Sequence, residues 1–407
     1  MAKNSGWMAI SGLFQAVIAF MANLVLIRFI EPEGFGRYAM TLASITLVMT
    51  ILYMQIGIQI VRTEDHEFDN AKKAMYFNAI VNWILIAGSI AFCVLYVTGL
   101  LDWWSGCLLV GTMISQFADH NKIFFEREMP YAKLSVLEAS VNGGGHVLSV
   151  FVVVLGGHVA ALYIRDLFYG IATLVWLSKI GGFSWYKLRF LNLKEWQAIV
   201  QKMKGLWLDA VLDNSFARIV LIIAAYVGGE KGAGYLFQAY RLAGVPHQLL
   251  APLAGRISFN WFSRQNSYAK RYSGLQLLIV YMSIPSALAA ITIFLYADKL
   301  VPFIFGEKWT SAAHLLVSLT GYIMFVSLFD LLRVFLIANY QTNHLLAMRA
   351  AQYLGVGVIM LALLAGFTMT EKNLSIGVSV AYTLACITSM WLIRVYNNKA
   401  SQQDASV

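Results

Sequence analysis

Apolar residues follow one another in long runs from one end of the chain to the other, and short polar segments separate these runs. A helix of about 20 apolar residues crosses the roughly 30 Å hydrocarbon core of a bilayer, so each run predicts one membrane span. Twelve such spans start near Trp7, Tyr38, Ala74, Trp104, Tyr131, His158, Gly205, Gly232, Ser273, Ala312, His344 and Asn373. The pattern therefore predicts an all-α integral membrane protein of about twelve transmembrane helices.

Composition agrees with this class and narrows the range of partners. Hydrophobic residues make up 59% of the chain and charged residues only 13%, against about 25% in an average soluble domain. In a membrane protein the formal charge of +9 reports basic cytoplasmic loops rather than a nucleic-acid partner. The three cysteines are far apart within apolar runs and show no metal-ligand spacing, so neither a metal site nor a disulfide framework is expected.

The placement of lysine and arginine predicts the orientation. If the N-terminus is cytoplasmic, most of the 30 basic residues, Arg349 among them, fall in segments on the cytoplasmic side, and few fall on the other side. This asymmetry is typical of inner-membrane proteins, whose basic loops stay in the cytoplasm. Both termini are therefore expected in the cytoplasm.

The longest polar segment between spans divides the chain into two halves. Within Gly181–Lys204, apolar residues recur at helical spacing, which predicts an amphipathic helix lying in the membrane interface. The expected organisation is an N-terminal six-helix lobe, an interfacial linker, a C-terminal six-helix lobe and a disordered cytoplasmic tail, at residues 1–178, 179–204, 205–396 and 397–407.

A faint internal repeat relates the two halves. When Glu31–Lys73 is aligned with Gly229–Arg271, the glycines at the first turn of each half coincide, and so do the basic residues that end the second span. Such repeats are common in transporters, whose two lobes have a shared ancestry. The repeat favours a duplicated transporter fold.

Four arginines fall inside the predicted spans, where a charged side chain is expensive. An arginine at the centre of a membrane helix costs roughly 2.5–3.5 kcal/mol on insertion scales, so each must face protein or water. Asp330 and Arg333 are three residues apart on one helix face, which predicts a structural ion pair. Arg165 and Asp166 are adjacent, about 100° apart around a helix, and are not expected to face each other.

The two other intramembrane arginines also lack an acid at a suitable spacing. Arg218 follows Asp213 by five residues, and Arg241 has no acidic residue within four positions. Arg165, Arg218 and Arg241 therefore either pair with acids on other helices or stay charged in a hydrated space.

Three motifs resemble those of a known transporter family. Ile27–Arg62, with its acidic turn followed by F-G-x-Y-A, resembles the opening of bacterial polysaccharide and O-antigen flippases, and Gly228–Leu242 and Val301–Leu316 resemble later motifs of the same proteins. These flippases belong to the multidrug/oligosaccharidyl-lipid/polysaccharide exporter superfamily. The resemblance implies two six-helix lobes around a central cavity in the inner membrane. It also implies translocation of an undecaprenyl-pyrophosphate-linked oligosaccharide, with coupling to H⁺ or Na⁺ in some members and no other cofactor.

The implied cargo supplies a reason for unpaired arginines. A pyrophosphate is a dense anion, and a guanidinium offers it two parallel hydrogen bonds. We therefore expect Arg165, Arg218 and Arg241 to line a cationic cavity, which Arg28 and Arg37 extend near the outer side. Salt bridges between helices are the alternative for each of the three.

Two carboxylates are candidates for binding a coupling ion. Asp209 and Asp213 are four residues apart on one face of the seventh span, where they can share a proton or a cation. Because Asp209 is close to the predicted cytoplasmic interface, simple solvation is the alternative.

Two other functions compete with a flippase. A drug or cation antiporter of the same superfamily would be expected to have an acidic cavity, and a membrane-embedded glycan polymerase or ligase would be expected to carry a long, functional outer loop. The outward loops here are short, and no carboxylate dyad or histidine constellation appears on them, so catalysis is not expected. The oligosaccharide, the membrane lipid and polysaccharide polymerase and chain-length proteins are the expected partners.

Overall fold

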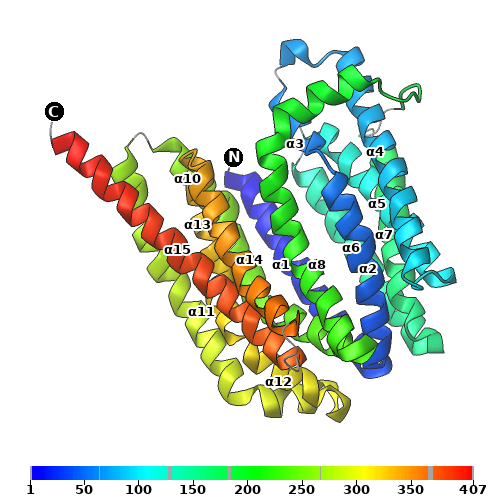
Figure 1. Ribbon diagram of the computed structural model, residues 1–407. Coiled ribbons are helices and arrows are strands. Elements are labelled where there is room, and N and C mark those ends of the chain that lie inside the picture. The colour runs from blue at the N-terminus through cyan, green and yellow to red at the C-terminus, as the bar shows by residue number, and fades with distance from the viewer. Residues whose placement is uncertain are drawn as a thin grey trace. The chain divides into compact units, whose positions relative to one another are not determined.

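The computed structural model describes residues 2–63, 65–126, 131–180, 185–265, 267–364 and 370–405, and in these ranges the chain is helical with no β-strand (Figure 1). Two compact units, Met1–Ile222 and Ile223–Val407, divide the chain inside the long helix α8 (Leu193–Ala243). The sequence placed this division in the linker 179–204. It falls later because the start of α8 is bonded to the first unit: the Trp207 indole donates to the Ile51 carbonyl at 3.0 Å.

Eight of the described helical segments are long and apolar enough to cross a membrane, which confirms the multi-span helical class. The count of twelve spans and the cytoplasmic termini stay predictions. Gly229, with φ 63° and ψ −165°, interrupts the helical path of α8 between the predicted seventh and eighth spans. The last helix, α15 (Glu371–Ala405), continues into the predicted disordered tail, so residues 397–405 are helical; they contain neither glycine nor proline to stop the helix.

The first unit is a bundle of helices joined by short turns. Its elements before α8 are α1 (Ala2–Phe29), α2 (Pro32–Leu52), α3 (Ile56–Arg62), η1 (Asp65–Glu67), α4 (Asn70–Val97), α5 (Trp103–Glu126), α6 (Tyr131–Val152), the π-helical turn η2 (Val153–Gly157) and α7 (Ala160–Lys179). Helix α7 packs on α5 and α6, α1 packs on α6, and α2 packs on α4.

Helices α5 and α7 approach closely through glycine. A Cβ atom added at Gly170 would lie 2.8 Å from the Ser115 hydroxyl, 2.9 Å from the Ser115 nitrogen and 3.0 Å from the Gly111 carbonyl oxygen. Two of these neighbours are backbone atoms, which move only if the helices separate. Small residues at such contacts let membrane helices gain van der Waals contact, because lipid provides no hydrophobic drive for helix association.

The predicted second span is broken between α2 and α3, where Gln55 has φ 51°. Backbone carbonyls at a broken helix end need other donors at membrane depth. Two tryptophan indoles provide them: Trp83 donates to Met49 at 3.2 Å, and Trp207 donates to Ile51. The break is thereby stabilised by side chains from α4 and α8.

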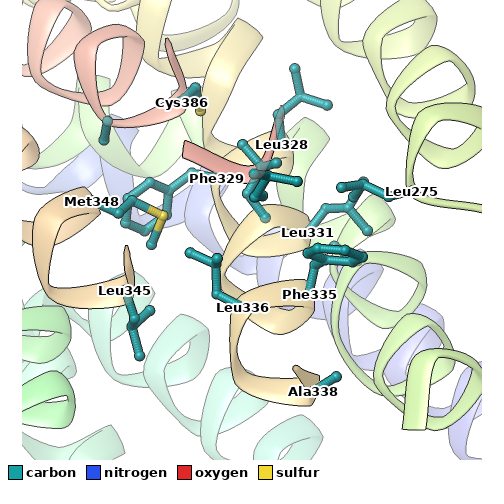
Figure 2. Packing of buried hydrophobic residues seen from close by; sticks show 14 of the residues in the cluster. Leu275, Leu328, Phe329, Leu331, Phe335, Leu336, Ala338, Leu345, Met348 and Cys386 are labelled. Atoms are coloured by element: carbon teal, nitrogen blue, oxygen red, sulfur yellow. The ribbon is translucent and has the colours of Figure 1, made fainter. Parts of the chain in front are cut away.

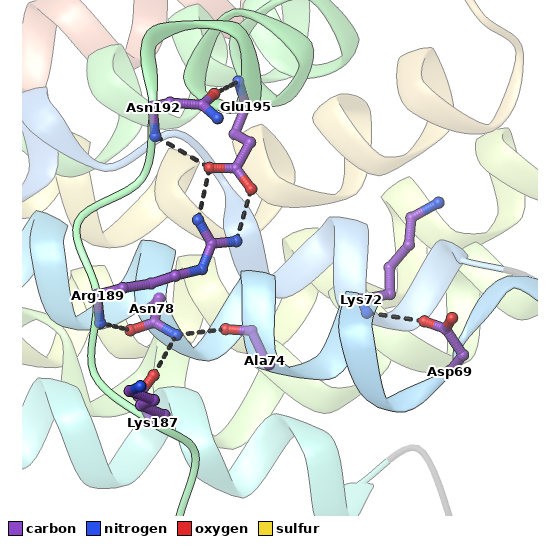
Figure 3. Close-up of polar contacts among 8 residues, drawn as sticks. All are labelled: Asp69, Lys72, Ala74, Asn78, Lys187, Arg189, Asn192 and Glu195. Carbon is purple, nitrogen blue, oxygen red and sulfur yellow. Dashed lines mark hydrogen bonds and ion pairs between the residues drawn. The ribbon is translucent and has the colours of Figure 1, made fainter.

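The linker before α8 is anchored to α4 by one asparagine (Figure 3). The Asn78 amide donates to the Lys187 carbonyl at 3.1 Å and accepts from the Arg189 nitrogen at 2.7 Å. Asn192 and Glu195 form a reciprocal capping box, each accepting the other's backbone N–H at 2.9 Å, which starts α8 at Leu193. Residues 185–192 precede the helix and have no regular secondary structure, and the helix predicted in the linker is the start of α8.

The second unit is built around a central helix. Its elements after α8 are α9 (Val245–Pro252), the π-helical turn η3 (Leu253–Ile257), α10 (Ser258–Arg264), α11 (Tyr268–Phe305), η4 (Glu307–Trp309), α12 (Thr310–Ser318), α13 (Thr320–Ala338), α14 (Thr342–Leu364) and α15. Figure 2 shows its core, in which Phe329, Leu331 and Phe335 of α13 are no more than 1% exposed. The apolar residues of α13 are buried by its neighbours α10, α11, α14 and α15.

The close contact between α5 and α7 predicts how a methyl group added at Gly170 affects stability. Gly170→Ala is expected to destabilise the protein by about 1–3 kcal/mol, because the added Cβ overlaps backbone atoms of α5. The apparent Tm in detergent should fall. The matched control is Gly143→Ala in α6, whose Cβ would meet only the end of Ile18 at 3.6 Å. Equal Tm changes for the two variants would contradict the packing argument.

The linker predicts a pH dependence. Hydrogen bonds from Arg189, and then from the Asn192 backbone, hold the pKa of Glu195 below its usual range. A folded-state pKa below the unfolded value stabilises the fold at neutral pH, and the contribution disappears as pH falls through the folded pKa. The Tm difference between wild type and Glu195→Gln should therefore shrink as pH falls from 7 to 3. A difference that stays constant would show that the ion pair contributes nothing.

Candidate functional site

Arg165 is not an isolated charge. Its Nε donates to Asp166 Oδ1 at 2.8 Å, its Nη2 donates to the Tyr38 hydroxyl at 2.8 Å, and that hydroxyl donates to Asp166 Oδ2 at 2.5 Å. The expectation that Arg165 and Asp166 do not face each other is wrong. The long arginine side chain curls back to its neighbour, and Tyr38 of α2 bridges both residues.

Arg165 also lies near the end of its helix rather than in the middle. Gly156 at φ 88° and His158 at φ 40° end the preceding segment, so α7 begins only at Ala160. Five residues of helix place Arg165 about 8 Å from that start. The triad of Arg165, Asp166 and Tyr38 therefore ties the first turns of α7 and α2 together.

The same end of the unit holds the two outer arginines. Arg37 donates from Nη2 to Asp102 Oδ2 at 2.8 Å, and Asp102 precedes α5. Arg28, in the last turn of α1, is exposed and has contacts of its own. An ion pair thus neutralises Arg37, as it does Arg165.

Arg218 differs from both of these arginines. Its Nε donates to the Thr46 hydroxyl of α2 at 2.6 Å, and its Nη1 donates to the Asn214 carbonyl. Asp213, five residues earlier on α8, lies within electrostatic range of the guanidinium, but the hydrogen bonds described for Arg218 go to these two neutral groups. Eleven residues separate it from Trp207, where the apolar segment begins, and eleven from the interruption at Gly229, about 16 Å each way along the helix.

The two carboxylates proposed for a coupling ion lie on α8 just before Arg218. Asp209 is only 5% exposed and Asp213 is half-buried, and both have contacts within the protein. Burial removes the alternative that Asp209 is simply solvated. The structure thus brings Asp209, Asp213 and Arg218 onto one helix within three turns.

In the second unit, the sequence predicted that Asp330 pairs with Arg333, three residues later. The contact that the structure describes for Asp330 is with a residue of another helix. The carboxylate Oδ2 of Asp330 lies 3.3 Å from His247 Nε2 of α9. His247, at the start of the irregular part of the eighth span, attracted no sequence-based prediction. Arg241 lies two residues before the end of α8, and it and Arg333 have contacts of their own.

A buried arginine escaped the sequence analysis. Arg349, expected in a cytoplasmic segment, lies in the second turn of α14 and is fully buried. Its Nη1 donates to Gln352 at 3.1 Å, and its guanidinium carbon lies 4.8 Å from the ring centre of Phe329. The side chain packs on an aromatic face, which sequence spacing alone does not reveal.

A second charged group in the first unit links three helices. Lys122 Nζ of α5 lies 2.9 Å from Glu138 of α6 and 3.5 Å from Asp119, which also accepts from the Tyr169 hydroxyl of α7 at 3.1 Å. Lysine between two carboxylates explains why Glu138 is tolerated in an apolar run. Among the described residues, no three His, Cys, Asp or Glu side chains gather as a metal site would require.

Relatives of the chain act in polysaccharide production. The chain is 23% identical over 320 residues to the succinoglycan biosynthesis transport protein ExoT of Rhizobium meliloti (strain 1021), covering 76% of this chain and 63% of that protein. It is 23% identical over 326 residues to the lipopolysaccharide biosynthesis protein WzxC of Escherichia coli (strain K12), covering 76% and 64%. The chain thus spans less than two thirds of the length of these relatives.

Solved structures with a similar fold are transporters. An inward-facing multidrug resistance MATE family transporter of the MOP superfamily superposes with a TM-score of 0.73 at 14% identity, over 97% of this chain and 99% of that one. The lipid II flippase MurJ superposes with a TM-score of 0.74 at 11% identity, over 95% and 87%. The fold of this multi-pass membrane protein is therefore the transporter fold that these two proteins share.

The expected resemblance is confirmed at the level of the family. A sequence profile described as "Polysaccharide biosynthesis protein" matches residues 25–314, from the end of α1 into α12, and so includes α2, α7 and α8 with Tyr38, Arg165 and Arg218. Since this match covers most of the chain, the protein belongs to the polysaccharide biosynthesis protein family.

Proposed function

We propose that this protein is a flippase that moves a polyprenyl-pyrophosphate-linked oligosaccharide from the cytoplasmic to the outer leaflet of the bacterial inner membrane. The family, the transport roles named for its relatives and the fold shared with a lipid II flippase support this function. The observation that carries it is Arg218, a guanidinium at the middle of a predicted span whose described hydrogen bonds go to a hydroxyl and a carbonyl.

The charge of Arg218 favours an anionic cargo. A guanidinium bonded only to neutral groups keeps its positive charge, and burying it costs several kcal/mol unless an anion or water compensates. A pyrophosphate compensates well, because charge-assisted bidentate hydrogen bonds to arginine are among the strongest in proteins. The same charge repels a cationic drug, which disfavours an antiporter of cations.

The other basic residues have separate roles in this proposal. Arg165 and Arg37 are neutralised by Asp166 and Asp102 and hold helices together. Arg28, which is exposed, adds basic charge in the first unit, and Arg241 adds basic charge in the second. The protein performs no covalent chemistry, and the polymerase and chain-length proteins that assemble the polymer act on its product.

Coupling to an ion gradient is also part of the proposal. Asp209 and Asp213, one turn apart and close to Arg218, would bind H⁺ or Na⁺ when the cargo leaves. A carboxylate that gains a cation as the guanidinium loses its phosphate would keep the local charge balanced, which low-dielectric surroundings require.

The first test is deletion of the gene. Cells without the protein should accumulate the lipid-linked oligosaccharide on the cytoplasmic face and lose surface polymer, because the glycan head group does not cross hydrocarbon unaided. Lipid extraction with a membrane-impermeant glycan label measures both effects. Accumulation on the outer face would point to a polymerase or ligase instead.

The second test replaces Arg218. Arg218→Gln should reduce export on the order of ten- to a hundred-fold at normal protein levels, because a charge-assisted hydrogen bond of about 1.5–3 kcal/mol is lost. Arg218→Lys should keep part of the activity. The assay is surface polymer per molecule of protein in the deletion strain.

The matched control for Arg218 is the arginine that already has an acid. Arg165→Gln leaves Asp166 buried without its cation and should lower protein level and Tm, whereas Arg165→Gln with Asp166→Asn should recover both. Full export by Arg218→Gln would refute the role of Arg218 in binding the cargo.

A further inference from the structure

Two titratable side chains meet inside the second unit. His247 Nε2 of α9 lies 3.3 Å from Asp330 Oδ2 of α13, and His247 Nδ1 lies 3.1 Å from the Ser327 hydroxyl. Within the described chain these are the polar partners of the imidazole. The histidine side chain is 18% exposed and the aspartate side chain 35%, so the pair is largely enclosed but not sealed.

Asp330 lies at the middle of its span, and His247 lies on an interrupted helix beside it. Asp330 is ten residues from the start of α13 and eight from its end, about 12 Å from the nearer one. His247 lies in α9, an eight-residue helix that begins after the interruption at Gly244 and ends at Pro252, before a π-helical turn. Ionisable residues at mid-membrane depth are expensive and mark ion or substrate pathways, above all on discontinuous helices.

Few other charges lie near the pair. Helix α9 packs on α11, α13 and η3, and η3 carries Arg256 in its sequence. Helix α11 carries no charged residue between Arg271 and Asp298; of its tyrosines there, Tyr272 is partly buried, and Tyr281 and Tyr296 are more than half exposed. On α13, Tyr322 lies within electrostatic range of Asp330, and so does Cys386 of α15.

Tyr322 also stacks with Tyr240 of α8 and Tyr382 of α15, at ring distances of 4.6 and 4.9 Å. Arg333 follows Asp330 by almost one turn and has contacts of its own. The acid that His247 contacts is thus Asp330, the other charged residues on α13 and η3 are Arg333 and Arg256, respectively, and the tyrosines and the cysteine are neutral near pH 7.

The partners of the ring suit two protonation states. When the imidazole is neutral, Nε2–H donates to Asp330 and the Nδ1 lone pair accepts from the Ser327 hydroxyl. When a proton from water binds Nδ1, the hydroxyl rotates from donor to acceptor and Nε2–H still faces the carboxylate. A serine hydroxyl can serve in both roles, so both ring nitrogens keep a partner in each state.

We infer that His247, Asp330 and Ser327 form a proton-binding site whose occupancy is linked to cargo movement; this inference rests on the proposed flippase function. Protonation converts the pair from a net charge of −1 to zero at mid-membrane depth. Because a full charge at that depth is costly, gain or loss of the proton shifts any equilibrium between two arrangements of the interrupted α9 span. Sodium suits the site less, because a hard cation prefers several oxygen ligands.

The first experiment detects the proton itself. The full-length protein in lipid nanodiscs is labelled at histidine Cε1, and the resonance of His247 is identified by its loss in His247→Gln. That resonance should move between pH 5 and 8, and its titration curve should change in Ser327→Ala, which removes the donor to the neutral ring. A His247 resonance that does not move with pH would overturn the proposal, whatever the protein transports.

The second experiment tests the link to transport. Lipid-linked oligosaccharide extracted from the deletion strain is reconstituted with the protein in liposomes, with and without a pH gradient. One proton per cargo allows a gradient of one pH unit to drive up to about tenfold accumulation, since one unit corresponds to a factor of ten in proton activity. The stimulation should be lost in His247→Gln and Asp330→Asn, with Tm confirming that both variants fold.

The chain offers a matched control, His314→Gln. His314 Nδ1 lies 3.2 Å from Asp298, but both side chains are about 60% exposed, so this pair should leave the gradient stimulation intact. Stimulation that survives in His247→Gln, or that follows a sodium gradient at equal pH, would overturn the coupling role. Wild-type liposomes that move no cargo with or without a gradient would instead refute the flippase function, and the titration alone would then decide the proton site.

Discussion

Charged side chains and backbone polar groups need interaction partners inside a bilayer, and this requirement governs the interior of the protein. Water is absent from the hydrocarbon region, so each guanidinium, carboxylate and free carbonyl needs a partner from the protein or a hydrated path to it. Arg165 obtains an acid and a tyrosine, Arg349 an aromatic face and a glutamine, and Arg218 only neutral oxygens. By their partners, Arg165 and Arg349 are structural, and Arg218 is the candidate for a functional role.

The same constraint governs the broken helices. Where α2 ends, Trp83 and Trp207 donate to carbonyls that the interruption leaves without helical partners. In the second unit the interruption at Gly244 is followed by two prolines and a π-helical turn, in the segment that contains His247. Breaks in membrane helices are tolerated where protein supplies the missing hydrogen bonds, and such sites are where a transporter can change shape at low cost.

The two units compensate their buried charges in different ways. In the first unit, Lys122 and Arg37 each face a carboxylate from another segment, and Arg165 pairs with Asp166 on its own helix while donating to Tyr38 of α2, so polar pairing contributes to helix association. In the second unit the core around α13 is apolar, and its aspartate faces a histidine, which is charged only when protonated. A pair that can lose its charge is poorly suited to holding helices together and well suited to responding to a proton.

The sequence by itself determined the class of the protein, because long apolar runs and basic loops are local properties that no tertiary contact can reverse. It also identified the family, and it marked Arg218 as one of three arginines without an acid at a suitable spacing along its own helix. Only the tertiary structure decided which charges are neutralised. The argument from adjacent positions failed for Arg165, because a long side chain reaches its neighbour and Tyr38 arrives from another helix, 127 residues away along the chain. Asp330 likewise contacts His247, a residue 83 positions away along the chain that the sequence analysis had not selected. Periodicity reports which face of a helix a residue occupies, whereas pairing depends on which other helix covers that face, and this follows only from packing.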